Sequence, residues 1–199
     1  MYEKLRGIVL NTVRYSDKHN IVHIYTDGHG LMSFAVPLGK TNAARMRNAM
    51  LMPLSLVDLE AGVRSSHEVS RLRELRRNYP LATIYSDPVK NAIALFISEL
   101  LAHVIQEPEG NGPLFRYIEQ SVQLLEQMPG QVANFHICFL YHLGAHLGHG
   151  EPPPDVLSGS HKPDYTRRGI YPDRVHPERW KACNPQRHCS APRSRVRRP

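Results

Sequence analysis

The first forty residues alternate apolar runs with turn-forming residues, a pattern that predicts three strands joined by short turns. The apolar runs lie at residues 8–10, 21–25 and 31–36. Between the second and third runs, Asp27-Gly28-His29-Gly30 suits a tight hairpin, because glycine adopts a positive φ at little steric cost. Residues 1–36 are therefore predicted to form a β-meander.

Two further strands are expected before residue 80. Residues 50–60 predict a fourth strand whose edge or entry is marked by Pro53. Residues 68–75 predict a fifth, although the same letters also fit the start of a short helix. The segment from Lys40 to Arg47 is interpreted as a basic connector. Five short strands in succession favour an OB-type barrel.

Beyond residue 80 the apolar spacing becomes that of helices. Asp87 and Pro88 supply an N-cap and a first-turn proline for a helix that continues to residue 107. Two more helices are expected, from Leu114 to Leu125 and over residues 132–147, and three helices predict a small bundle. One face of the first helix carries Val89, Ile93, Phe96, Leu100 and Val104. Leu95, Leu101 and Ile105 widen this stripe, so the helix is expected to be covered on more than one side.

After Gly148 the composition changes abruptly. Residues 151–199 contain 9 of the 16 prolines and 11 of the 25 basic residues. Such a segment buries too little apolar surface to offset the entropy lost on ordering. Two interpretations stay open: a disordered basic arm that grips nucleic acid through residues 193–198, or an out-of-frame or truncated C-terminus.

These patterns predict a β + α protein with three segments. A five-stranded OB-type barrel occupies residues 1–80, an incomplete all-α domain residues 81–148, and a disordered Pro/Arg-rich tail residues 149–199. The net charge of +7 is divided unevenly, because the barrel has 12 Lys and Arg against 7 Asp and Glu, whereas residues 81–150 have 2 against 6. A basic barrel attracts phosphate backbones, since cationic side chains release the counterions condensed on nucleic acid.

The details of the meander resemble the start of the RecO family of bacterial recombination mediators. The resemblance is carried by Arg14-Tyr-Ser-Asp-Lys18 in the first loop and by Tyr25-Thr26 before His29-Gly30-Leu31. In the helical part, Ser98-Glu-Leu-Leu101 and Leu114-Phe115 stand where the family has similar helix residues. The resemblance extends to about residue 148. It implies an OB-fold followed by a helical domain whose last helices are missing from this chain.

The resemblance also implies a function in DNA repair without turnover chemistry. Members of the family bind single- and double-stranded DNA, anneal complementary strands and, with RecR, assist the loading of RecA onto DNA coated by single-strand-binding protein (SSB). The helical domain would capture the C-terminal tail of SSB, and RecA would be an indirect partner. The expected location is the bacterial cytoplasm, at the nucleoid.

Under this resemblance the barrel face and its loops contact DNA. Tyr15 is the best stacking candidate, although packing on the barrel rim is the alternative; a stacked base is worth about 1–3 kcal/mol. Tyr25 and Phe34 are further aromatic candidates, and the core suits Phe34 better. The expected DNA-binding residues are Arg6, Arg14, Tyr15, Lys18, Lys40, Arg45, Arg47, Arg71 and Arg73.

Other chemistry finds little support in the sequence. The segment Pro37-Leu-Gly-Lys40 lacks the remaining glycines and the Ser/Thr of a phosphate-binding loop, so neither a nucleotide cofactor nor catalysis is expected. A metal hypothesis is suggested by the cluster of His136, Cys138, His142, His146 and His149. His142 and His146 lie four apart on a predicted helix and could face one ion, but histidines near a helix end need no such role. Cys183 and Cys189 have the wrong spacing for a usual zinc pair, so no metal ligand is assigned.

A second interpretation belongs to another functional class. The barrel would grip a partner protein and never touch DNA, as a non-catalytic interaction module. The dependence of DNA binding on salt separates the two interpretations, because only phosphate contacts release counterions.

Overall fold

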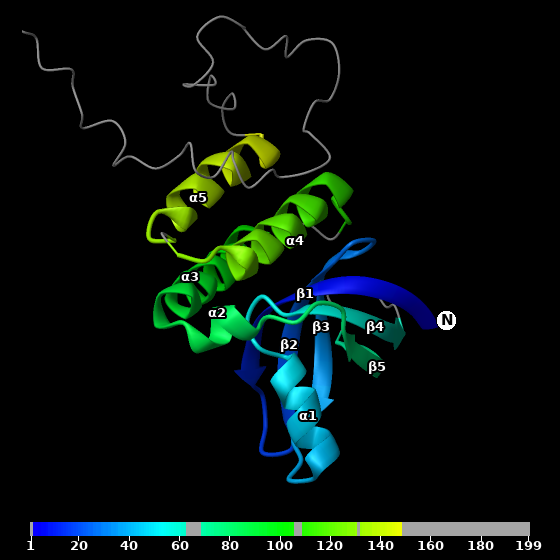
Figure 1. The fold of residues 1–199 in the computed structure, drawn as a ribbon. Coiled ribbons are helices and arrows are strands. Elements are labelled where there is room, and N and C mark those ends of the chain that lie inside the picture. The colour runs from blue at the N-terminus through cyan, green and yellow to red at the C-terminus, as the bar shows by residue number, and fades with distance from the viewer. Residues whose placement is uncertain (1, 63–68, 106–108, 131, 149–199) are drawn as a thin grey trace, which may run out of the picture.

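The computed structural model describes residues 2–62, 69–105, 109–130 and 132–148 and confirms the β + α architecture. The strands precede all helices but one along the chain (Figure 1). The strands are β1 (Tyr2–Arg14), β2 (His19–Thr26), β3 (Gly30–Pro37), β4 (Leu56–Gly62) and β5 (Ser70–Arg77). The helices are α1 (Asn42–Met50), α2 (Ala82–Ser86), α3 (Pro88–Val104), α4 (Gly112–Gln127) and α5 (Phe135–His146).

The strands close into a barrel in the order β1-β2-β3-β5-β4. Four of the pairings are antiparallel, and a short parallel pairing of β3 with β5, at Phe34 opposite Ser70 and Ala35 opposite Arg71, completes the closure. Closure satisfies the backbone groups that a free edge would expose. The predicted barrel is confirmed, and residues 70–77 are a strand rather than a helix.

The hairpin between β2 and β3 also forms as predicted. Gly30 has a φ of 63°, the left-handed conformation that favours glycine. The hydroxyl of Thr26 donates to the carbonyl oxygen of Gly30 over 2.9 Å and accepts from the backbone N–H of His29 over 3.2 Å. The turn is therefore fixed by one buried threonine side chain.

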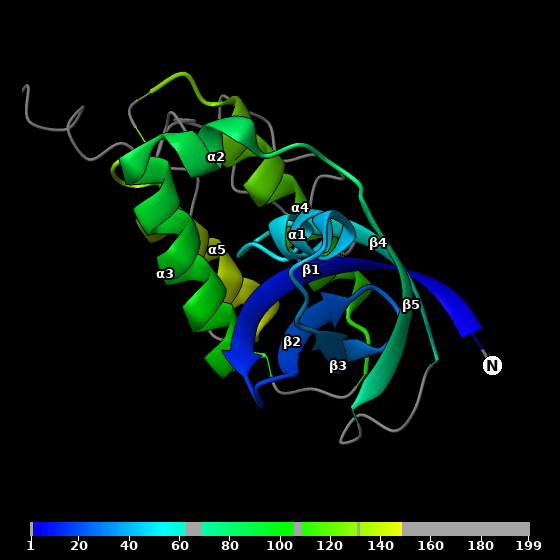
Figure 2. The ribbon, with the colours of Figure 1, turned by 90° about the horizontal axis from the view of Figure 1, so that it is seen from below.

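Strand β1 contributes to two apolar cores. Leu5 and Val9 point into the barrel, whereas Ile8 and Leu10 belong to the core shared with the helices. The alternation of a strand makes this possible, because odd-numbered residues face the barrel interior and even-numbered residues face the helices, ahead of a bulge between Val9 and Asn11. The same strand therefore lines the barrel and docks the helices, with α3 running beside its end (Figure 2).

Helix α3 begins where the sequence predicted, but its buried face differs from the prediction. The Asp87 carboxylate caps it by accepting from the backbone N–H groups of Val89 and Lys90 over 2.8 and 3.2 Å. The expected face was wrong in part, because Val89, Phe96 and Val104 are exposed, whereas Ile93, Leu101 and Ile105 are buried as expected. The helix packs against β1, α2 and α5, and these neighbours select another side. That side consists of Lys90, Ile93, Ala94, Ile97, Ser98 and Leu101.

A buried lysine joins three of the helices. The Nζ atom of Lys90 donates 2.9 Å hydrogen bonds to the hydroxyl of Thr83 on α2 and to the backbone carbonyl oxygen of Glu126 on α4. The Glu126 carboxylate accepts from the N–H groups of Thr83 and Ile84 over 2.8 and 2.9 Å. Helix α2, which the sequence did not predict, is thus held through its first turn by polar contacts.

The segment interpreted as a basic connector is largely the helix α1, so that interpretation was wrong. Thr41 is its N-cap, and the Thr41 hydroxyl accepts from the N–H of Ala44 over 3.2 Å. The residues that follow are mostly alanine, methionine and arginine, which are strong helix formers. The basic charge of this segment is compatible with a helix, which the propensity of its residues favours.

Candidate nucleic-acid interface

Five cationic residues belong to elements at the end of the barrel that lies away from α3, α4 and α5, the end where Figure 1 shows α1. Three adjoining pieces of surface make up this region, which we call the basic end. They are the β1–β2 turn (residues 15–18), the β3–α1 linker (residues 38–41, called the connector from here on) and α1. The cations on or beside these pieces are Arg14, Lys18, Lys40, Arg45 and Arg47.

The β1–β2 turn is tightly organised around one serine. The Ser16 hydroxyl accepts from the backbone N–H groups of Lys18 and His19 over 3.3 and 3.1 Å. The N–H groups of Tyr15 and Ser16 both donate to the carbonyl oxygen of His19. With its backbone fixed in this way, the turn leaves the Tyr15 ring 76% exposed.

The connector lies directly beside this turn. The backbone N–H of Leu38 donates to the carbonyl oxygen of Lys18 over 2.8 Å. Gly39 follows Leu38 in the connector, and a Cβ on Gly39 would lie 2.8 Å from the Cβ of Ala44 in α1. The glycine therefore permits a close approach, and the turn, connector and helix form one continuous surface.

Helix α1 is anchored by one side and by its C-terminal end. Ala44 and Leu51 are buried, whereas Arg45 is exposed. The guanidinium of Arg77, on β5, donates to the carbonyl oxygen of Ala49 over 2.9 Å and satisfies a helix-terminal acceptor. The helix is thus fixed to the barrel with Arg45 facing solvent.

The electrostatics of the basic end favour an anionic ligand. Residues 28–57 contain no Asp or Glu, and the nearby Asp17 pairs with Arg14 over 3.0 Å. Both partners of this pair are largely exposed, so it contributes little stability. Within the described ranges, Lys18, Lys40 and Arg45 form no ion pair. They are therefore available for phosphate groups.

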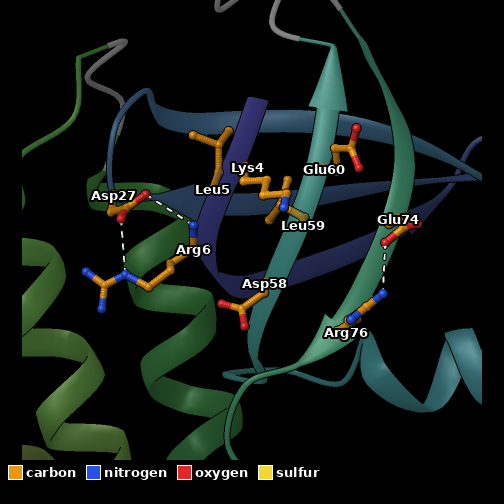
Figure 3. Close-up of a pocket in the computed structure, with 9 residues that line it drawn as sticks. All are labelled: Lys4, Leu5, Arg6, Asp27, Asp58, Leu59, Glu60, Glu74 and Arg76. Atoms are coloured by element: carbon orange, nitrogen blue, oxygen red, sulfur yellow. Dashed lines mark hydrogen bonds and ion pairs between the residues drawn. The ribbon is translucent and has the colours of Figure 1, made fainter. Parts of the chain in front are cut away.

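A second part of the barrel has a different charge pattern. The outer faces of β1, β4 and β5 line a hollow of about 340 Å³ (Figure 3). Asp58 and Glu60 on β4 lie between the cations of β1 and the Glu74–Arg76 pair of β5. Its charged lining has four carboxylates against three cations, so the hollow is unsuited to a polyanion. The lining residues are Lys4, Leu5, Arg6, Asp27, Asp58, Leu59, Glu60, Glu74 and Arg76.

Three of the expected DNA contacts lie outside the basic end. Arg6 pairs with Asp27 over 3.1 Å and with Glu119 of α4 over 3.2 Å, at the junction of barrel and helices. Arg73 pairs with Glu60 over 2.9 Å. Arg71 is exposed on β5 beside the closing pair with β3. The structure thus brings together Arg14, Tyr15, Lys18, Lys40, Arg45 and Arg47 and separates Arg6, Arg71 and Arg73 from them.

Two aromatic candidates are buried. Phe34 is fully buried inside the barrel, as the sequence favoured. Tyr25 is 1% exposed, and its ring packs 5.9 Å from that of Phe115, centroid to centroid. Its hydroxyl donates to the carbonyl oxygen of Asn111 over 3.3 Å. Tyr25 therefore fastens the barrel to α4 and offers no surface to a base.

Comparison with known proteins assigns the chain to a family. The family profile described as Recombination protein O N terminal matches residues 1–79, and the one described as Recombination protein O C terminal matches residues 85–150. The chain belongs to the RecO family. The proteins named DNA repair protein RecO from Phocaeicola vulgatus and Bacteroides fragilis are 37% and 38% identical over 148 residues. A protein of the same name from Porphyromonas gingivalis is 31% identical over 147 residues.

The alignments cover a larger share of this chain than of its relatives. The alignments include 74% of this chain and 61% of the Phocaeicola and Bacteroides proteins, and 72% and 59% for the Porphyromonas protein. The chain therefore spans about three fifths of the length of the curated RecO relatives that it matches.

The histidines of the helical part lie near one another around a tyrosine. The ring of His146 stacks on that of Tyr117 at 4.6 Å, centroid to centroid, and the His142 ring lies 6.5 Å from it. Burial, followed by the charge of His142, lowers the pKa of His146. Among the described residues, no group of three or more His, Cys, Asp or Glu is placed to hold a metal ion. His149, Cys183 and Cys189 lie outside the described residues.

The described helices also give no membrane segment, since none of them is long and apolar enough to cross a bilayer.

Sequence reasoning missed part of this RecO-family surface. Arg77 was not singled out, although it holds the end of α1, and Met46 is 69% exposed on that helix. The signal that was available is Thr41 followed by a run of helix formers, which predicts a capped helix. The position of Arg77 next to α1 depends on the pairing of β5 with β4 and has no local signal.

Proposed function

We propose that this RecO-family chain binds DNA through the basic end of its barrel. The observation that carries the proposal is the charge of that end: five cations stand against the single carboxylate of Asp17. The hollow between β1, β4 and β5 is different, because its charges nearly balance, so the basic charge is no general property of the barrel surface. Phosphate groups would therefore be drawn to one end of the barrel.

The binding would combine phosphate neutralisation with stacking. Lys18 and Lys40 lie on adjacent segments joined by a backbone hydrogen bond, so they can contact neighbouring phosphates of one strand. The exposed ring of Tyr15 lies beside them and offers a face to a base. Neither of these two contacts reads the base sequence.

The broader role follows the family. The chain would act as a recombination mediator in the bacterial cytoplasm, at the nucleoid, annealing complementary strands and, with RecR, assisting RecA on SSB-coated DNA. It would work by binding alone, without turnover chemistry. Residues 81–150 carry a net charge of −4, from 2 basic against 6 acidic residues. An acidic SSB tail would therefore depend on apolar contacts, for which Phe96, Ile137 and Tyr141 are exposed.

The test is fluorescence anisotropy of labelled single-stranded DNA with the full chain at several salt concentrations. Contacts to about five phosphates predict a log–log slope near −3.5. Charge reversal of Arg14, Lys18 and Lys40 to Glu should abolish most of the binding and flatten the slope. Charge reversal of Lys4 and Arg76, in the hollow, is the control and should have little effect.

A second candidate function is supported by the hollow itself. Its paired rows of opposite charges suit a protein segment that carries both signs. The chain would then be a non-catalytic interaction module. Absence of DNA binding by the unaltered full chain at low salt would reject the DNA proposal and favour this one.

A further inference from the structure

Helix α1 presents one complete face to solvent. Asn42, Arg45, Met46 and Ala49 are all exposed. Their spacing of three, four and seven residues places them on the same side of an α-helix. This face contains no carboxylate, and its most exposed apolar side chain, Met46, is 69% accessible.

The exposed face is not needed to hold the helix in place. Ala44 and Leu51, on the opposite side, are 5% and 7% exposed and pack toward the barrel. Thr41 caps the start of the helix, and Arg77 binds the Ala49 carbonyl oxygen near its end. A rigid helix thus carries an outer surface that stays exposed among the residues that the structure describes.

We infer that this outer face of α1 enters the major groove of duplex DNA, while the β1–β2 turn holds a single strand. The inference rests on the proposed DNA binding and adds the form of DNA that each element recognises. A major groove about 12 Å wide admits an α-helix. Arginine and asparagine side chains bond to base edges there, and small apolar groups contact thymine methyls. Arg45, Asn42 and Met46 supply these chemistries on one face.

The residue compositions of α1 and of the β1–β2 turn favour different forms of DNA. Helix α1 has no aromatic residue on which an unpaired base can stack, whereas the turn exposes Tyr15. The lack of any Asp or Glu in residues 28–57 matches α1 to a polyanion rather than to a protein of mixed charge. Because the connector joins the two elements, the basic end fits a junction where single strands enter a duplex.

Three substitutions on the full chain test the assignment. Met46→Glu adds a negative charge to the helix face, and Leu95→Glu adds the same charge at a half-exposed apolar position on α3. We expect Met46→Glu to weaken duplex binding by about tenfold, because the added carboxylate is repelled by the phosphates and replaces an apolar contact with the bases. Single-strand binding should then stay within about twofold of the unaltered chain, and Leu95→Glu should change neither affinity. Tyr15→Ala should show the reverse selectivity and weaken single-strand binding alone.

The groove is tested by competition against the unaltered chain bound to duplex DNA. Methyl green, a major-groove ligand, should displace the protein, and distamycin, a minor-groove ligand, should not. Displacement by distamycin alone, or an equal loss of both affinities in Met46→Glu, would overturn the inference while leaving DNA binding by the basic end intact. If the unaltered chain binds neither form of DNA, the proposed function itself fails, and α1 becomes a candidate surface for a protein.

Discussion

Gly110, in the segment before α4, lies directly against the backbone of Gly28 in the β2–β3 hairpin. A Cβ on Gly110 would be 2.6 Å from both the carbonyl carbon and the carbonyl oxygen of Gly28. Contacts this short are repulsive, so the position admits only glycine unless one backbone moves. The two glycines therefore set how closely the helical part can approach the barrel.

Gly110→Ala is expected to destabilise the protein by about 1–3 kcal/mol, because the added methyl group must displace a backbone. Gly130→Ala is the matched control, since a Cβ at Gly130 meets nothing within 4 Å. Urea unfolding followed by circular dichroism measures both. Equal stability of the two variants would show that the hairpin yields easily to the helical part.

Arg6 gives a second test of the same junction. Its guanidinium lies 5.2 Å from the centroid of the Phe115 ring and pairs with Asp27 and Glu119. Arg6→Met should therefore lower the free energy of unfolding by about 1 kcal/mol, from the lost cation–π contact and half-exposed ion pairs. DNA affinity should stay within about twofold if the basic end carries the phosphate contacts. A large loss of DNA affinity with unchanged stability would return Arg6 to the DNA-binding surface.

The sequence predicted the barrel well because its signals are local. Alternating apolar residues and the Gly30 turn specify β2 and β3, and the order of strands before helices follows from the change of period. The buried face of α3 could not be predicted in the same way. Val89, Phe96 and Val104 have the right spacing to be buried, but the position of β1 and α2 beside the helix places Ala94, Ile97 and Ser98 inward instead.

The candidate site shows the same difference between features with local sequence signals and features that depend on distant segments. Lys18 and Lys40 lie together because the β2–β3 register carries the chain back to the turn, which the hairpin pattern already implied. The ion pair of Arg6 with Glu119 could not be predicted from the sequence, since Glu119 is 113 residues away in the chain. Charge alone does not distinguish an arginine that faces DNA from one that pairs with a distant carboxylate.

Lys40 and Lys4 form a matched pair for the salt dependence of DNA binding. Both are exposed lysines of the barrel, one at the basic end and one in the charge-balanced hollow. Lys40→Ala should reduce the magnitude of the single-strand salt slope by about 0.7, the share of one phosphate contact. Lys4→Ala removes the same charge and should leave the slope unchanged. If both variants reduce it equally, the net charge of the chain matters rather than the position of the lysine.

The lowered pKa of Glu126 predicts that the stability of the fold decreases in acid. Burial alone would raise its pKa, but the hydrogen bonds from Thr83 and Ile84 and the nearby charge of Lys90 outweigh burial and hold the pKa below the ordinary 4.5. The unfolded chain therefore binds a proton more readily than the folded one. The stabilisation is fully present above pH 4.5 and is lost as the pH falls through the lower folded value.

Glu126→Gln should consequently lower the free energy of unfolding by about 1 kcal/mol at neutral pH, because the glutamine amide has a single acceptor oxygen and leaves one of the two N–H groups without its partner. The difference from the unaltered chain should shrink as the pH falls below 4.5, where the native carboxylate also becomes neutral. Thermal unfolding at a series of pH values measures it, with Glu109→Gln, at an exposed position before α4, as the control. A difference that stays constant down to strongly acidic pH would mean that the charge of Glu126 does not stabilise α2, and that its shape and packing do.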